Sequence, residues 1–272
     1  LHPAFGMRAG LLLVPMGFLN EQHEPPTVLG VARPETERRI LPSTWSEDGV
    51  GVFGSAGGVS YRAYVVNGFN GLGFSAAGLA GGRQQGSNAL AQTGAVVARL
   101  DYQGLRGLTV GASGYFGNAG QGQASGGQRV AARTLIWEGH AALQMSGLDL
   151  RALLSVATVA DGAALNAING VSGSASVGQR LVGGYAQLGL NILEYTRYTD
   201  RLIPYVRYER VNTQDRVPTG FSADPANDAQ ILTVGAEWEP IERVVFKADF
   251  QRVHTAAETG VPRLDVALGY VF

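Results

Sequence analysis

Hydrophobic and polar residues alternate with a period of two through most of this chain, the pattern of a β-strand with two unlike faces. In the segment 148–155, Leu150 and Leu154 fall on one face, whereas Asp149 and Arg151 fall on the other. Helical periodicity of comparable length is absent, because glycine and β-branched residues interrupt every candidate helix. The chain is therefore predicted to be all-β.

The alternation predicts about twelve strands, most of them near the roughly ten residues that a tilted strand needs to cross a bilayer. They are expected at 5–14, 49–56, 58–67, 91–103, 106–116, 131–145, 148–158, 180–193, 202–212, 229–239, 243–253 and 263–272. No window holds the roughly eighteen consecutive apolar residues that a transmembrane helix requires. If the chain crosses a membrane, it is predicted to do so with strands.

The connections between these strands alternate between short and long. Short links fall at 55–57, 104–105, 146–147, 195–200 and 240–242, and long links fall at 15–48, 68–90, 117–130, 159–179, 213–228 and 254–262. Membrane barrels have short periplasmic turns and long external loops, whereas a soluble Greek-key sandwich has no reason to keep this order. The fold is therefore predicted to be an antiparallel up-and-down transmembrane β-barrel that forms a single domain, residues 1–272.

Each predicted strand has one face suited to hydrocarbon and one face that carries charges. Burying those charges in a packed soluble core would cost several kcal/mol each, and a water-filled lumen removes that cost. The residues expected to line the pore are Arg8, Arg62, Arg99, Asp101, Glu138, His140, Asp149, Arg151, Arg207, Glu209, Glu237, Lys247 and Asp249. Because the cations and anions in this set nearly cancel, the lumen is expected to be only weakly selective.

The composition excludes several classes of protein. The chain contains no cysteine, so disulfides, thiolate metal sites and cysteine nucleophiles are ruled out. A net charge of −1 argues against binding to nucleic acid, which needs a concentrated basic surface. Lys247 is the only lysine, and every other cation is arginine.

Two groups of polar residues could carry chemistry, and each has a plainer interpretation. Glu138 and His140 share one strand face, and Ser113 and Ser155 lie on lumen-facing positions, but no Gly-x-Ser-x-Gly elbow surrounds either serine. The favoured interpretation is a titratable pair in a wet pore wall, so no catalytic residue is assigned. The protein is not expected to be an enzyme.

Loop segments also contain candidate metal ligands. The segment 21–24 includes Glu21, His23 and Glu24, but a metal site needs three or four converging ligands. The segment 224–228 lacks the central glycine and distal glutamate of an EF-hand. A solvated loop is favoured for both, and neither a metal nor a cofactor is expected.

The long link 15–48 is the candidate for constricting the pore. Pro34 suits the first position of a helix, and Glu35 and Arg39 form a favourable i,i+4 pair, so a single helical turn is predicted there. Loops longer than about fifteen residues are usually functional. We expect this loop either to narrow the mouth, with Arg33, Arg38 and Arg39 turned inward, or to pack externally on its neighbours.

The last nine residues resemble the terminal strand of bacterial outer-membrane barrels. Leu264, Val266, Leu268, Tyr270 and Phe272 form an apolar ladder that closes on an aromatic residue. The resemblance implies that Tyr270 and Phe272 form an assembly signal read by the barrel-assembly machinery, which would then be a partner. A soluble sandwich can also end on an alternating strand, and the short-long alternation of the links favours the barrel.

Two further stretches resemble the phosphate-selective porin O/P family over about a third of the chain. In the first, a strand ends near Pro15-Met16-Gly17, a Gly-Val strand begins at 48–52, and the next strand ends at Asn67-Gly68; the second, 229–253, is similar to the family's penultimate hairpin. The resemblance implies a sixteen-stranded trimeric porin. Its setting would be the lipid bilayer and lipopolysaccharide of a Gram-negative outer membrane.

About twelve strands can be counted, so N-terminal strands are expected to be missing from the chain, with a closed twelve-stranded barrel as the alternative. The balanced lumen charge departs from the cation-rich lining to which the family's phosphate selectivity is attributed, so that selectivity is not expected. The predicted function is a porin for small hydrophilic solutes or ions. The alternative is a structural barrel that anchors a surface layer or an envelope assembly.

Overall fold

Twelve long strands form one antiparallel sheet in which each strand pairs with the next long strand along the chain. The computed structural model describes residues 3–22, 24–86 and 88–271. The strands are β1 (Gly6–Leu13), β2 (Ser46–Ala56), β3 (Val59–Asn67), β4 (Gly94–Tyr102), β5 (Leu108–Asn118), β8 (Arg133–Met145), β9 (Leu148–Val159), β10 (Arg180–Leu190), β11 (Arg201–Arg216), β12 (Asp228–Ile241), β13 (Val244–Thr255) and β14 (Arg263–Tyr270). The predicted all-β, up-and-down antiparallel architecture is confirmed, and each expected strand overlaps one of these.

Short helices and one small hairpin lie in the connections. They are η1 (Pro25–Thr27), α1 (Thr36–Arg39), η2 (Gly71–Gly73), η3 (Ala80–Gly82), the hairpin of β6 (Ala124–Ser125) and β7 (Gln128–Arg129), α2 (Gly162–Ile168), η4 (Gly173–Ala175) and η5 (Pro225–Asn227). The helical turn expected after Pro34 is confirmed as α1, where Arg39 Nε lies 2.7 Å from Glu35 Oε2. None of the helices in the described residues has the length and apolar character needed to span a membrane.

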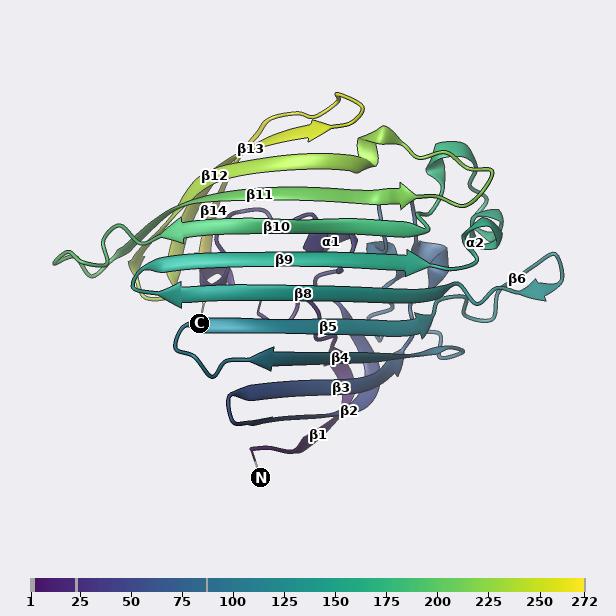
Figure 1. Cartoon of the computed structure of the whole chain (residues 1–272), viewed down its shortest axis with the longest axis horizontal. Helices are drawn as coiled ribbons and strands as arrows, with labels where there is room; N and C mark the ends of the chain where they lie inside the picture. Colours follow the sequence, from purple (N-terminus) through teal and green to yellow (C-terminus); the bar gives the residue numbers. More distant parts are fainter. Residues whose placement is uncertain (1–2, 23, 87, 272) are drawn as a thin grey trace.

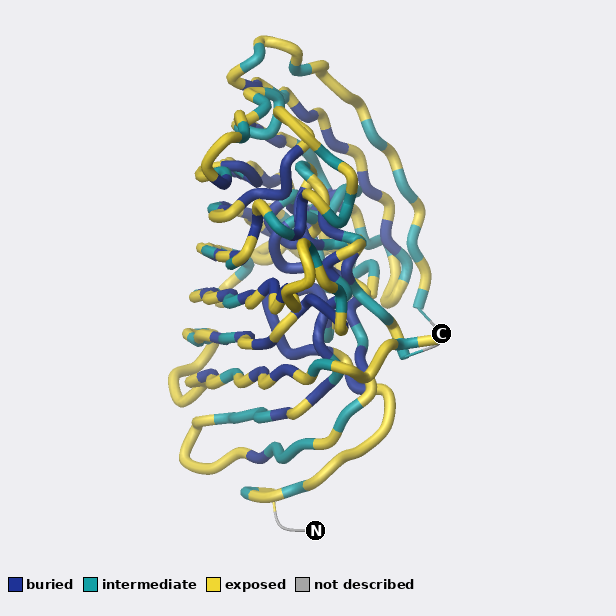
Figure 2. The backbone as a smooth tube through the Cα atoms, turned by 90° about the vertical axis from the view of Figure 1, so that its right-hand side faces the viewer, coloured by how far each residue is buried: buried dark blue, intermediate teal, exposed yellow. Residues whose placement is uncertain are grey.

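The sheet curls into an open C, seen along the strands in Figure 2. Within the described residues, β1 pairs only with β2 and β14 pairs only with β13, so one edge of each strand is left without a strand partner. The chain therefore forms the curved wall of an up-and-down barrel, with a gap between its first and last strands.

Short turns lie at one end of the wall and long connections at the other (Figure 1). Two of the short turns depend on residues with positive φ: Gly57 and Gly58 at 60° and 81°, and Ser146 and Gly147 at 54° and 78°. Consecutive positive φ values are those of two-residue hairpin turns whose twist matches that of the strands. The long connections contain α1, the β6–β7 hairpin and α2.

The convex face of the wall is an apolar ladder. Leu154 is 72% exposed there, whereas the next residue back along the chain, Leu153, faces inward and is fully buried. Phe116 and Trp137 lie on this outer face toward the long connections, and Trp238 lies on it near the short turns. Aromatic residues toward both ends of an apolar band are typical of membrane barrels.

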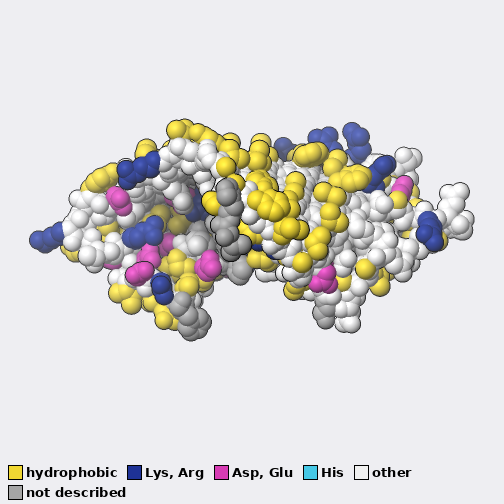
Figure 3. Space-filling model, turned by 90° about the horizontal axis from the view of Figure 1, so that it is seen from below, with side chains coloured by type: hydrophobic (Ala, Val, Ile, Leu, Met, Phe, Trp, Pro, Cys, Tyr) yellow, Lys and Arg dark blue, Asp and Glu magenta, His cyan; other side chains and the backbone are white. Residues whose placement is uncertain are grey.

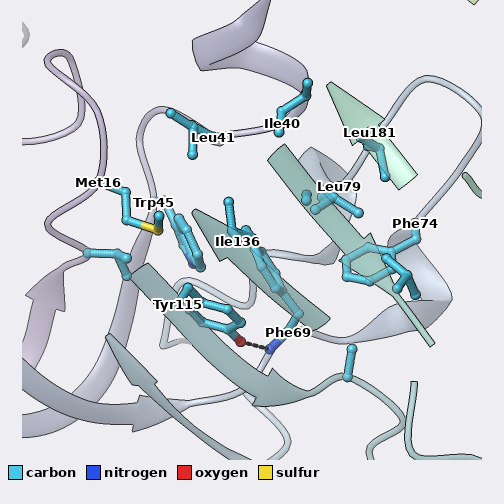
Figure 4. Close-up of a cluster of buried hydrophobic side chains, with 14 of the residues drawn as sticks. Met16, Ile40, Leu41, Trp45, Phe69, Phe74, Leu79, Tyr115, Ile136 and Leu181 are labelled. Atoms are coloured by element: carbon cyan, nitrogen blue, oxygen red, sulfur yellow. Dashed lines mark hydrogen bonds between the residues drawn. The ribbon is translucent and has the colours of Figure 1, made fainter. Parts of the chain in front are cut away.

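The concave face carries a packed apolar core near the long connections (Figure 4). The rings of Trp45 and Phe69 stack with centroids 4.4 Å apart, and the Phe69 amide donates to the Tyr115 hydroxyl over 3.0 Å. Ile136 of β8 and Leu181 of β10 are fully buried beside them. The wall does not face a water-filled lumen at this end, because loop side chains cover its apolar inner positions.

Candidate functional site

The connection from β1 to β2 folds back against the concave face, where Figure 1 shows α1 behind the wall. Val14 and Trp45, near the two ends of this connection, are fully buried. The Asn20 side chain joins them: its amide donates to the carbonyls of Val14 (2.8 Å) and Trp45 (2.7 Å), and its oxygen accepts from the Trp45 amide (2.7 Å). We call residues 14–45 the inner loop.

Cationic side chains of the wall donate hydrogen bonds to carbonyls of the inner loop. These bonds run from Arg99 of β4 to Gly17, from Arg151 of β9 to Thr27 (2.9 Å), from Arg207 of β11 to Ala32 (3.0 Å), and from Lys247 of β13 to Pro25 (2.6 Å) and Val28. The four donors come from four strands, so the wall holds the loop along much of its length.

Carboxylates of the same wall accept hydrogen bonds from amides of the inner loop. Glu209 accepts from Glu35 (2.9 Å) and Thr36 (2.6 Å), and Asp249 accepts from Val31 (2.7 Å). Glu209 and Asp249 are each only 2% exposed. Backbone amides of the loop thus donate the hydrogen bonds that water would otherwise donate to these carboxylates.

Lys247 has the most partners of the four cations. Besides the bonds to Pro25 and Val28, its Nζ lies 3.4 Å from the Gly30 carbonyl oxygen and 3.0 Å from Glu237 Oε2. An ammonium group offers three donors around one charge, which suits several converging carbonyls better than the planar fork of arginine does. This chemistry gives a physical reason for the only lysine to stand here.

These contacts correct one expectation from the sequence. Arg207, Glu209, Glu237, Lys247 and Asp249 face inward but are buried, with 1–7% of each residue exposed, rather than lining a wet pore. The physical reason is that the inner loop covers this part of the wall. Its backbone bonds to Arg207, Glu209, Lys247 and Asp249, while Glu237 pairs with Lys247.

Glu37 is a buried carboxylate inside the loop itself. Its Oε2 accepts from the Leu19 amide (2.9 Å), and its Oε1 accepts from the Tyr185 hydroxyl of β10 (2.6 Å). Burial raises the pKa of the Glu37 carboxyl above its usual value, although both hydrogen bonds act in the opposite direction. Glu37 joins two parts of the loop to the wall.

His140 lies in a closed network of charged residues on β4, β5 and β8. Its Nδ1 is 2.5 Å from Glu138 Oε1, and its Nε2 is 2.8 Å from Asp101 Oδ1. Arg99 Nε donates to Asp101 (2.8 Å), and the Ser113 hydroxyl donates to Glu138 (2.6 Å). A serine nucleophile needs a base such as histidine within hydrogen-bond reach, and here the hydroxyl bonds to a carboxylate instead. The network fits a structural role.

The other predicted pore residues lie toward the short turns. Arg62 pairs with Glu21 (3.2 Å) and Asp101 (3.1 Å), and Arg151 pairs with Asp149 (2.9 Å). Arg8 lies 4.0 Å over the Phe53 ring.

Two polar cavities, of about 440 and 420 Å³, open between the inner loop and this part of the wall. Both are lined by Gln22, Gln144 and Arg151. A hollow lined with polar and charged groups therefore lies on the short-turn side of the inner loop.

The three loop arginines are partly neutralised. Arg38 and Arg39 both pair with Glu35, while the structure gives no ion pair for Arg33 in its described part. The backbone of the segment 224–228 includes the short helix η5, and the Asp224 side chain accepts from the Ala226 amide (2.9 Å).

No group of three or more potential metal ligands occurs within the described ranges. Tyr270 is 58% exposed on the outer face. His23 and Phe272 lie outside the described residues.

Comparison with known proteins gives one clear relative. No protein-family model matches the chain. An uncharacterized protein of Aquifex aeolicus (strain VF5) is 35% identical over 258 residues, which are 92% of this chain and 58% of the relative. The chain thus spans less than two thirds of that relative's length.

Solved structures give weaker similarities. A porin refined at 1.8 Å has a TM-score of 0.48 at 12% identity, covering 83% of this chain and 62% of the porin. The ferric enterobactin receptor of Pseudomonas aeruginosa has a TM-score of 0.44 at 11% identity, with 82% and 38% covered. A BenF-like porin of Pseudomonas fluorescens has a TM-score of 0.40 at 10% identity, with 83% and 67% covered. These similarities are too weak to assign a function.

The raised pKa of Glu37 predicts how pH changes the stability of the inner loop. A carboxyl whose pKa is raised on folding stabilises the folded state fully below its unfolded value, here 4.5, and loses that contribution as pH rises through the folded pKa. We therefore expect the melting temperature of the wild type to fall as the pH rises over this interval. The variant Glu37→Gln should show a smaller shift; parallel pH profiles for the two proteins would contradict the assignment.

Proposed function

We propose that this chain forms a large part of the wall of an outer-membrane channel for small hydrophilic solutes, with the inner loop as a fixed constriction. The observation that carries the proposal is the opposite character of the two faces. The outer face exposes a continuous apolar band, with Val96 51%, Leu154 72% and Phe250 49% exposed. The inner face holds paired charges such as Arg151 with Asp149 and Lys247 with Glu237, so lipid outside and a polar interior satisfy both faces.

The gap between β1 and β14 fits a larger barrel. In hydrocarbon every backbone amide and carbonyl needs a partner, which rules out open sheet edges facing lipid. We propose that further strands pair with these two edges, in keeping with the sixteen strands implied by the porin resemblance. Trimer formation and recognition of the terminal strand by the barrel-assembly machinery belong to the same proposal.

Weak ion selectivity follows from the pairing of the inner charges. Arg62 and Arg151 are paired with carboxylates, and Arg38 and Arg39 share Glu35. At physiological ionic strength the Debye length is about 8 Å, so charges across a wide lumen are largely screened from one another. Phosphate selectivity forms no part of the proposal.

The packed core near the long connections favours a second candidate. Trp45, Phe69 and Tyr115 fill the space behind this part of the wall with apolar side chains. A barrel sealed in this way could anchor a surface layer or an envelope assembly and conduct little. Single-channel recording of the full-length protein in a planar bilayer separates the two candidates, because the scaffold predicts no conductance.

A substitution on the outer face tests the location in the membrane. Leu154→Arg places a charge in the middle of the apolar band and should destabilise the protein in vesicles by about 2–4 kcal/mol if that position is near the bilayer centre. The matched control is Leu105→Arg in the short turn between β4 and β5, where the leucine is 57% exposed. Equal unfolding free energies for the two variants would argue against a lipid-facing band.

A substitution on the inner face tests the constriction. Lys247→Gln removes the ammonium that binds the carbonyls of Pro25 and Val28, so the inner loop should loosen and the single-channel conductance should rise. The matched control is Arg252→Gln on the outer face of the same strand, for which no rise is expected. Unchanged conductance in Lys247→Gln, with a loop shown by proteolysis to be loosened, would contradict the constriction.

A further inference from the structure

Exposed arginines gather on the outer face of the wall near the long connections. They are Arg133 of β8, Arg180 of β10, Arg210 and Arg216 of β11, and Arg252 of β13. All five lie on the same face as the apolar ladder, next to positions such as Tyr208 and Leu232. Figure 3 shows basic side chains along the upper edge of the half that carries the long connections, beside hydrophobic side chains. We call these five residues the arginine belt.

Two members of the belt face each other directly. Arg180 and Arg216 are partners in the register of β10 and β11. Like charges at directly opposed positions destabilise a sheet. An anion that binds both guanidinium groups would turn this repulsion into attraction.

The protein's own carboxylates pair with only two of the five belt arginines. Asp215 lies 3.3 Å from Arg180, and Asp228 lies 3.3 Å from Arg210. Within the described part of the chain, Arg133, Arg216 and Arg252 have no side-chain hydrogen bond or ion pair. Three unpaired cations therefore remain where the apolar band ends.

At the opposite end of the wall, the arginines lie in other positions and have carboxylates nearby. Arg106, Arg197 and Arg243 lie in the short turns at this end, and the exposed Arg201 of β11 pairs with Glu239 (2.8 Å). Asp200 and Glu242 lie in the same turns, and Glu242 is 3.9 Å from Arg243. The excess of positive charge on the outer strand face thus belongs to the long-connection end.

We propose that the arginine belt binds the phosphomonoester groups of phosphorylated lipid headgroups in the leaflet that surrounds the long connections. This inference rests on the proposed location in a membrane. A guanidinium group binds phosphate through two parallel hydrogen bonds, which makes arginine better suited to this ligand than lysine. At the border of an apolar band that contacts acyl chains, the phosphate within reach is the one on the headgroup of the same lipid.

The test measures how a phosphorylated lipid stabilises the full-length protein. Thermal unfolding is followed in phosphatidylcholine vesicles with and without bis-phosphorylated lipid A. We expect lipid A to raise the melting temperature of the wild type, and the variant Arg133→Gln/Arg216→Gln/Arg252→Gln to lose most of that rise. Since these three arginines have no side-chain hydrogen bond or ion pair among the described residues, their replacement breaks no such contact of the fold. The control, Arg106→Gln/Arg197→Gln/Arg243→Gln, should keep the rise.

Further arms identify the source of the phosphate. Inorganic phosphate added to phosphatidylcholine vesicles should leave the melting temperature unchanged, and dephosphorylated lipid A should produce no rise. An equal rise in the wild type and the belt variant, or a rise with dephosphorylated lipid A, would overturn the inference. Channel conductance is recorded for the same samples in phosphatidylcholine bilayers, where the belt variant should match the wild type. A wild-type protein that conducts but shows no rise with lipid A therefore refutes only the belt, whereas absence of conductance in the wild type refutes the channel.

Discussion

The charges on the concave face of the sheet need partners, and the rest of the structure depends on how they find them. An unpaired charge in a buried position costs several kcal/mol. Here Lys247 and Glu209 bond chiefly to backbone groups of the inner loop, and Arg207 and Asp249 each make one such bond. The loop has no regular ladder of its own that would use up those groups. The charged side chains of the wall thus form hydrogen bonds with backbone amides and carbonyls of the loop.

This arrangement divides the interior into two zones. Near the long connections, the aromatic cluster around Trp45 fills the space behind this part of the wall. Toward the short turns, polar cavities lined by Gln22 and Arg151 remain open. Any solute that passes along this wall must cross the boundary between the zones, which is the inner loop. The proposed function therefore depends on how firmly the loop is held.

The wall could be predicted from the sequence, whereas the packing inside it could not. Period-two alternation predicts the strands, because the face on which a side chain lies depends only on its position within the strand. The contact of Trp45 with Phe69 joins two aperiodic segments, and no local pattern encodes such a contact. The position of Lys247 on the inner face of the wall could be predicted. Its partners could not, because they include backbone carbonyls, which every residue type provides. Its being the only lysine was the one available signal.

Amide hydrogen exchange of the full-length protein in vesicles tests most directly whether the wall holds the inner loop. The amides of Val31, Glu35 and Thr36 donate to wall carboxylates, so they should exchange as slowly as amides within β11 and β13. Exchange of these three amides as fast as that of the exposed connection 256–262 would contradict the account.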